Sequence, residues 1–234
     1  MRWWKKSNPD SHSKVGALFN EFILGGQDGL VNVLGIVLGV SAASSNLQLA
    51  IIAGLAATFA EGFSMGAVAY TSSKAEESYY ESEKEKEISE IKDTPKQERK
   101  EIYDIYYKKG FRGKLLNDIV KHITSNKKIW LNIMMKEELK LEKDKVNPLK
   151  KGLIVGLATV IGSMIPIISL FFLKFPIAIY SSIIISAAAL FVTGAIEAKI
   201  NVGNWVKKGF QLMLIGMIAA VIGFAIGKIL GVSV

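Results

Sequence analysis

The sequence predicts an all-α membrane protein with five transmembrane helices, interrupted after the second by a charged helical module. Half of the residues are hydrophobic and the mean hydropathy is +0.30, which is too apolar for an ordinary soluble domain. The charge is also segregated, because 20 of the 29 Lys and Arg residues and 16 of the 21 Asp and Glu residues lie between Lys74 and Lys151. The rest of the chain holds apolar runs of about 20 residues, the length that one helix needs to cross a bilayer.

The chain therefore divides into three parts. Residues 1–73 hold an N-terminal segment and two spans, residues 74–151 form the charged module, and residues 152–234 hold three more spans. We expect the five spans, each an apolar run of helical length, at about 25–45, 49–72, 152–173, 176–197 and 209–231. Small residues recur within them at four-residue spacing, in the pairs Gly35/Gly39, Gly62/Gly66, Gly152/Gly156 and Gly223/Gly227. Such pairs allow close helix approach in lipid, although glycine is common in membrane helices in any case.

The basic residues predict the orientation of the spans. They precede the first span, fill the module, and recur between the fourth and fifth spans, which places all three groups on one side. The positive-inside rule then puts the N-terminus and the module in the cytoplasm and the C-terminus outside. The start, MRWWKKSNPDSHSK, has no apolar core, so we expect no cleavable signal peptide, with Trp3 and Trp4 as interfacial anchors.

The module is expected to be a small helical bundle. The long second helix continues from its span into the polar stretch 74–90 and ends at Asp93-Thr94-Pro95, with Thr94 as the N-cap of the next helix. Gly110 and Gly113 end that helix, a short segment follows at about 112–123, and a last helix is expected at about 127–143.

The turn at Asp93-Thr94-Pro95 is flanked by two pairs of glutamates. Glu87 and Glu90 share a helix face before the turn, as Glu98 and Glu101 do after it. A helical hairpin would gather the four carboxylates, and carboxylates on facing helices build metal sites in bundles. The alternative is a solvated acidic face, because the whole stretch is rich in Lys and Glu.

The last helix of the module carries two possible sulfur ligands. Met134 and Met135 lie one turn from Glu138, although packing inside the bundle would also explain at least one of the two methionines. Carboxylate oxygens suit Mg²⁺, Ca²⁺ and Mn²⁺, and thioethers suit softer metals, so the mixed set favours Fe²⁺ or Mn²⁺.

Two carboxylates stand inside the apolar spans. Glu61 lies in the middle of the second span, with Met65 one turn further on the same face, and Asp28 lies at the start of the first. Ionisable groups in a bilayer cost several kcal/mol unless paired or hydrated, so we expect these three residues to line a cation pathway. Asp28 has the alternative of capping a helix at the interface, since Gly25, Gly26 and Gly29 surround it.

Several other classes of function are excluded or disfavoured. There is no cysteine, so thiolate metal sites and cysteine nucleophiles are excluded. A carboxylate di-metal oxidase of the ferritin type needs Glu-x-x-His, but His12 and His122 have Pro9 and Ile119 three residues earlier. No phosphate-binding glycine loop is present, and cytoplasmic loops explain the net charge of +8 without nucleic acid.

The segments DGLVNVLGIVLGV (28–40), SMGAVAYTSSKAE (64–76) and MMKEEL (134–139), in a chain of five spans with a polar insert after the second, resemble the vacuolar iron transporter family. The resemblance implies a homodimer that carries Fe²⁺ or Mn²⁺ out of the cytosol in exchange for protons. It also implies cytosolic metal ligands at Glu87, Glu90, Glu98, Glu101, Met134, Met135 and Glu138, a pore acid at Asp28 and a pore methionine at Met65. Plant-type members carry their second-span acid at the position of Ala57, one turn from Glu61.

We therefore expect a metal transporter and not an enzyme, with metal as cargo, no resident cofactor and no nucleic-acid partner. Its location would be the plasma membrane of a prokaryote, or a vacuolar or other organelle membrane of a eukaryote. The alternatives are a membrane-bound carboxylate di-metal oxidase and a membrane scaffold whose helical module binds a partner.

Overall fold

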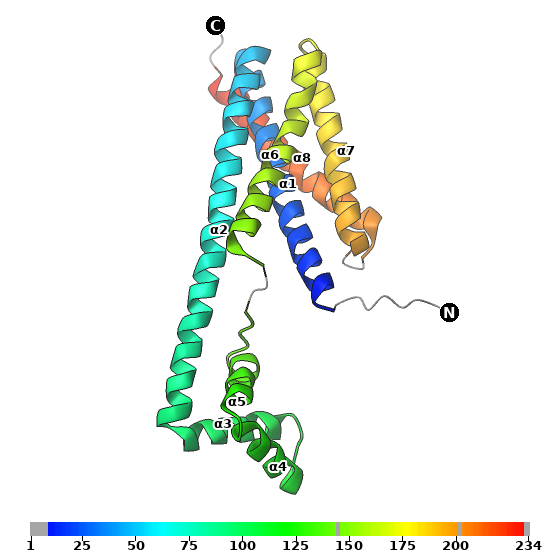
Figure 1. Ribbon diagram of the computed structural model, residues 1–234. Helices are drawn as coiled ribbons and strands as arrows, with labels where there is room; N and C mark the ends of the chain where they lie inside the picture. The colour runs from blue at the N-terminus through cyan, green and yellow to red at the C-terminus, as the bar shows by residue number, and fades with distance from the viewer. Residues whose placement is uncertain (1–8, 144–145, 201–202, 232–234) are drawn as a thin grey trace, which may run out of the picture. The chain divides into compact units, whose positions relative to one another are not determined.

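The computed structural model describes residues 9–143, 146–200 and 203–231, and every element in these stretches is a helix. In chain order they are α1 (Pro9–Ser44), α2 (Leu47–Asp93), α3 (Pro95–Lys108), α4 (Gly113–Thr124), α5 (Lys127–Ile133), the π-helical turn η1 (Met134–Glu138), α6 (Pro148–Phe172), α7 (Ile177–Ile200) and α8 (Trp205–Leu230) (Figure 1). Trp3 and Trp4, the expected interfacial anchors, lie outside the described residues.

Five of the described helices are long and apolar enough to cross a membrane, as the sequence predicts. They are the stretch Leu18–Ser44 of α1 and the helices α2, α6, α7 and α8. The first, third and last begin several residues earlier than expected, at Leu18, Pro148 and Trp205, because charged side chains such as Glu21 and Lys207 are tolerated near the end of a span.

The chain forms two compact units. Met1–Thr71 and Val146–Val234 make up the first, which we call the membrane unit, and Ser72–Lys145 make up the second, which we call the module unit. Helix α2 contributes its first half to the membrane unit and its second half to the module unit.

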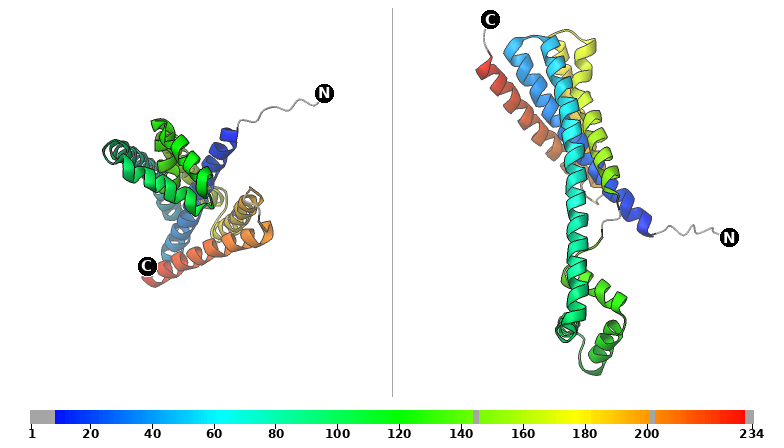
Figure 2. Two further views of the ribbon diagram at one scale, coloured as in Figure 1. Left: turned by 90° about the horizontal axis from the view of Figure 1, so that it is seen from below. Right: turned by 60° about the vertical axis from the view of Figure 1, so that its left-hand side comes forward.

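Glycine pairs set the helix packing in the membrane unit. Helix α1 contacts α6, α7 and α8, and α8 crosses it obliquely (Figures 1 and 2). A Cβ atom on Gly223 or Gly227 of α8 would overlap the backbone of α1 at Gly35 or Gly39. The two other predicted pairs also meet, since a Cβ on Gly156 would lie 2.8 Å from the carbonyl oxygen of Gly62. Lipid offers no hydrophobic force between helices, so their association depends on van der Waals contact. Glycine allows the backbones to come close enough for that contact.

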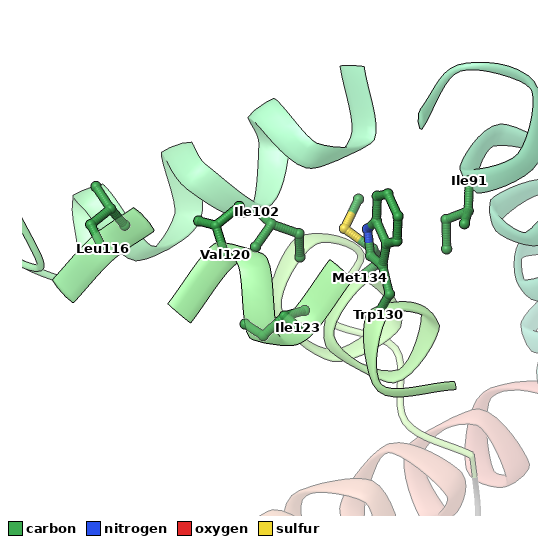
Figure 3. Close-up of a cluster of buried hydrophobic side chains, with 7 residues drawn as sticks. All are labelled: Ile91, Ile102, Leu116, Val120, Ile123, Trp130 and Met134. Carbon is green, nitrogen blue, oxygen red and sulfur yellow. The ribbon is translucent and has the colours of Figure 1, made fainter. Parts of the chain in front are cut away.

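The module unit has an apolar core of its own, built from α2, α3, α4, α5 and η1. The buried side chains of this core are Ile91, Ile102, Leu116, Val120, Ile123, Trp130 and Met134 (Figure 3). Pro95 stands at the start of α3 as expected. Thr94 occupies the N-cap position but its hydroxyl donates back to the carbonyl of Glu90 at 3.1 Å, so its side chain does not cap α3.

The last helix of the module differs from the continuous helix expected over 127–143. It consists of α5, capped by the side chain of Asn126, followed by η1, after which the described residues 139–143 are not helical. In η1 the Leu139 N–H donates to the carbonyl of Met134 at 3.1 Å, five residues back. The hydrogen-bond register therefore slips by one residue at the predicted ligands, and π-helical turns are frequent at functional sites.

Candidate metal-binding and pore sites

The turn at Asp93-Thr94-Pro95 brings two glutamates together inside the module unit. Glu87 of α2 and Glu98 of α3 are each only 3% exposed, and their carboxyl groups lie close enough for one to donate a hydrogen bond to the other when it is protonated. Oε1 of Glu87 and Oε2 of Glu98 are buried without a donor in the described structure. A carboxylate buried in this way is costly unless a proton or a cation neutralises it.

Three more carboxylates complete two triads around this buried pair. Ligand oxygens of Glu87, Glu90 and Glu98 lie within 4.8 Å of one another, and so do those of Glu98, Glu101 and Glu138. Two oxygens on opposite sides of one divalent ion stand about 4–5 Å apart, from metal–oxygen distances of roughly 2.0–2.6 Å. Each triad therefore has the spacing of a divalent cation site, and Glu98 belongs to both.

The carboxyl groups are held close without an ion-pair partner among the described residues. Across the described part of the chain, none of the five glutamates forms an ion pair with Lys or Arg, whereas the nearby Glu137 pairs with Lys109 at 2.5 Å. The amide of Gln97 donates a hydrogen bond to Oε1 of Glu101 at 3.2 Å. The cluster thus keeps an uncompensated negative charge when its members ionise.

This crowding raises the affinity of the site for protons. Burial raises the pKa of Glu87 to about 8, with further contributions from the hydrogen bond to Glu98 and from the charges of Glu98, Glu138 and Glu90. Desolvation raises the pKa of Glu138 to about 7, supported by the charges of Glu101, Glu98 and Glu90. The pKa of Glu98 is also raised by burial. A bound divalent cation would have the opposite effect on these pKa values, because it favours the ionised form of each carboxyl group.

Both predicted sulfur ligands are buried. Met134 is 0% exposed and packs with Trp130 and Ile102 in the apolar core (Figure 3), and Met135 is 2% exposed. Core packing therefore accounts for Met134, the alternative that the sequence leaves open. Glu138 in the same π-helical turn still reaches the second triad, so both thioethers lie within one turn of a candidate ligand carboxylate.

The membrane unit contains a second polar group, formed by α1 and α2. The Asn32 amide donates a short hydrogen bond to Oε1 of Glu61, and the Asp28 carboxyl lies against the carboxyl of Glu61. Asp28 and Asn32 are four residues apart on one face of α1, as Glu61 and Met65 are on α2. Asp28 stands inside α1, far from either of its ends, so the helix-cap alternative is wrong.

Asn32 is the residue that the sequence interpretation missed. It is exposed, while Asp28, Glu61 and Met65 are partly buried. The signal was present, because a polar amide one turn from an acid inside an apolar span shares its face. Ala57, one turn before Glu61, packs against the apolar cluster around Val33 and Val37 instead of facing a polar group.

Comparison with known proteins gives a consistent result. A family model described as the VIT family matches residues 19–228. This range includes the module unit and all five candidate spans, except for the first residue of the first span and the last two residues of the fifth. The chain is 31% identical to Vacuolar iron transporter 1 of Tulipa gesneriana over 95% of its own length and 91% of that protein. It is 31% identical to Vacuolar iron transporter of Plasmodium berghei (95% and 87%) and 28% identical to Vacuolar iron transporter 1 of Arabidopsis thaliana (94% and 89%).

Proposed function

Because the chain belongs to the VIT family, whose members are membrane transporters and not enzymes, we propose that it carries Fe²⁺ or Mn²⁺ out of the cytosol in exchange for protons. The family and the five apolar helices show an integral membrane protein that transports metal. The oxidase alternative is wrong for the same reason. Direction, ion and proton coupling are the parts that we propose.

Capture of metal is assigned to the module unit. The observation that carries this step is the pair of triads that meet at Glu98, with five carboxylates and no basic partner among the described residues. Oxygen ligands next to the thioethers of Met134 and Met135 favour first-row divalent ions over Ca²⁺. Iron is the metal in the relatives' names, and the ligand chemistry extends the proposal from Fe²⁺ to Mn²⁺.

Passage through the membrane is assigned to Asp28, Asn32, Glu61 and Met65. The carboxyl groups of Asp28 and Glu61 lie close enough to interact, so a divalent cation bound by both, or a proton on one of them, would remove their mutual repulsion. Metal and protons then compete for one place, which is the physical basis of exchange. The amide of Asn32 positions Glu61, and the Met65 thioether offers a softer ligand one turn further along α2.

A homodimer would cover this polar face. Asn32 is exposed, and Asp28 and Glu61 are only partly buried in a single chain. Polar side chains in a bilayer normally face a bundle interior or water, so a second copy that faces the same residues would complete the pathway. The basic residues support a cytoplasmic N-terminus and module. In a eukaryote the relatives' names favour the vacuolar membrane, and in a prokaryote the plasma membrane is the expected location.

The test is metal uptake by the full-length protein in proteoliposomes, with Fe²⁺, Mn²⁺, Ca²⁺ and Mg²⁺ outside and a metal-sensitive dye and a pH dye inside. We expect uptake of Fe²⁺ or Mn²⁺ with protons moving in the opposite direction. Glu61→Gln should abolish both movements, whereas Glu197→Gln, which changes a carboxylate paired with Lys208 outside the polar face, should leave them intact. Uptake without proton movement would contradict exchange, and no uptake of any ion would favour the scaffold alternative.

A further inference from the structure

A cavity of about 420 Å³ lies among α1, α7 and α8 in the membrane unit. Leu38 and Ser41 of α1, Tyr180 and Ile183 of α7, and Met217 and Phe224 of α8 are among the residues that line it. It is separate from the pore group, because Ser41 follows Asp28 by 13 residues, about 20 Å along the helix. No carboxylate lines this cavity, and the transport pathway proposed above does not pass through it.

One polar group in the cavity wall has no partner. Ser41 is 3% exposed, and its hydroxyl has no hydrogen-bond partner in the described structure. Ser163 and Ser186 of the same unit are also buried without a partner, but neither lines this cavity, whereas Ser44 donates to the carbonyl of Val40 at 2.8 Å and Ser182 to that of Pro166 at 2.7 Å. A buried hydroxyl without a partner is costly, and an oxygen atom of a bound molecule would remove that cost.

The hydroxyl groups of the cavity lining gather at one end, which they share with Phe175 and Pro176. Ser41, Ser45 and Tyr180 lie near the turns that join α1 to α2 and α6 to α7, which Figure 1 shows at the same end of this unit. Leu38, Ile183 and Met217 lie deeper along their helices. Helix turns mark the bilayer interface, and the depth of Ser41, about 5 Å inside the end of α1, matches the level just below the headgroups.

We propose that this cavity binds an acyl chain of a membrane phospholipid, with an ester carbonyl oxygen accepting the hydrogen bond of Ser41. Its volume lies within the range of about 300–1,000 Å³ found for small-molecule sites, and its inner lining is aliphatic and suits a hydrocarbon chain. A phospholipid reaches the cavity from the bilayer with its ester groups at the interface, at the end of the lining that holds the hydroxyl groups. The acyl chain would then pack between α1 on one side and α7 and α8 on the other.

A second apolar groove in the same unit provides a contrast. It measures about 450 Å³ and lies between α2 and α6, where Phe63, Ala67 and Leu153 are among its lining residues. The only hydroxyl in its lining belongs to Tyr70, which is 41% exposed. This groove contacts lipid without a buried hydrogen-bonding group, so we expect it to hold lipid less selectively.

The experiment uses the full-length protein in nanodiscs of phosphatidylcholine that contain a trace of phosphatidylcholine with a diazirine on one acyl chain. After photolysis, mass spectrometry should find the label on peptides that carry Leu38, Ile183 and Met217. Ala42→Phe, which fills the cavity from α1, should lower this labelling at least fivefold, and Val221→Trp serves if that variant fails to fold. Ala67→Phe fills the other groove and should leave labelling of the cavity unchanged.

The hydrogen bond has its own measurement. Ser41→Ala removes the hydroxyl without adding volume to the cavity wall, and we expect labelling to fall about three- to tenfold. An unlabelled dialkyl ether lipid, which lacks the carbonyl oxygen, should compete with the probe less well than the diester lipid by a similar factor.

Equal labelling in the wild type and both cavity-filling variants would overturn the proposal, as would equal competition by ether and ester lipids. Stronger labelling by a diazirine fatty acid than by the phospholipid would overturn the phospholipid as occupant, and cross-linking of two copies through Val221→Cys without lipid labelling would assign the cavity to a second chain.

Discussion

Replacing Glu87 by Gln should stabilise the metal-free module unit at neutral and alkaline pH while weakening its binding of metal. Glu87 is buried, and its pKa is raised from the ordinary value of 4.5 to about 8, first by desolvation and then by Glu98 and the other acids. Because the folded form holds the proton more tightly than the unfolded chain, unfolding releases a proton between these two pH values. The free energy of unfolding of the metal-free unit therefore falls as pH rises from about 4.5 to 8, and below 4.5 the penalty is absent.

The size of the effect follows from the same two values. A difference between 4.5 and about 8 corresponds to about 5 kcal/mol at 1.36 kcal/mol for each pH unit. Water has partial access to the cluster and Glu98 shares the proton, so we expect about half of this, roughly 2–3 kcal/mol. Gln keeps the shape of Glu, cannot ionise, and can donate a hydrogen bond from its amide to Glu98. Glu87→Gln should therefore recover most of this free energy of unfolding above pH 8.

Hydrogen exchange measured by mass spectrometry on the full-length protein in detergent would test this prediction. Amides in the peptides that carry Ile91 and Ile102, at the centre of the module core, should exchange about 30- to 150-fold more slowly in Glu87→Gln than in the wild type at pH 8. The two proteins should converge near pH 5, after correction for the intrinsic exchange rate. Glu85→Gln, an exposed acid on the same helix, should behave as the wild type. No gain in protection at pH 8 would refute the view that the buried acid opposes folding of the empty site.

Three further predictions concern the metal, the pore and the packing. Metal binding should displace protons from the module unit, so the affinity of the module unit for metal should rise from pH 6 to 8.5. Calorimetry in buffers of different ionisation enthalpy should detect the released protons, and equal heats in all buffers would contradict this prediction. Asn32→Leu should slow metal uptake at least tenfold by freeing Glu61, without weakening metal binding by the module unit, whereas Gln48→Leu at the start of α2 should leave uptake unchanged. Gly227→Ala should lower the melting temperature by a few degrees, since its Cβ would overlap the backbone of α1 at a cost of about 1–3 kcal/mol, and Gly16→Ala, which meets open space, is the control.

The helices of the membrane unit could be predicted from the sequence because each depends on a local property. An apolar run of about 20 residues is sufficient to indicate a span, and the four-residue spacing of Gly35 and Gly39 places two small residues on one face. Both features are confirmed, since five described helices are long and apolar enough and these glycines meet α8. Spacing alone does not indicate which helix each pair meets, and it did not mark Asn32 as a partner of Glu61.

The module unit shows where local pattern is insufficient. The i,i+3 spacing places Glu87 and Glu90 on one face, yet Glu87 is buried and Glu90 is exposed. That difference depends on how α3 packs against α2, which brings Glu98 over Glu87 and not over solvent. The π-helical register at Met134 is likewise a product of packing, because the residue sequence over 127–143 is compatible with an uninterrupted α-helix.

The apolar core beside the acids explains how the module unit folds although the cluster of carboxylates destabilises it. Five carboxylates that lack basic partners among the described residues repel one another, and burial of Glu87 and Glu98 adds a desolvation cost. The opposing contribution comes from the adjacent core, where Ile91, Ile102 and Met134 lose nearly all exposure to water, at roughly 1.5–3 kcal/mol for each buried side chain. Ile91 follows Glu87 by four residues and Ile102 follows Glu98 by four, so each buried acid and one core residue share a helix face. The apolar residues therefore hold the acids in place without metal, and a cation bound as proposed above would need only to replace protons in a site that is already formed.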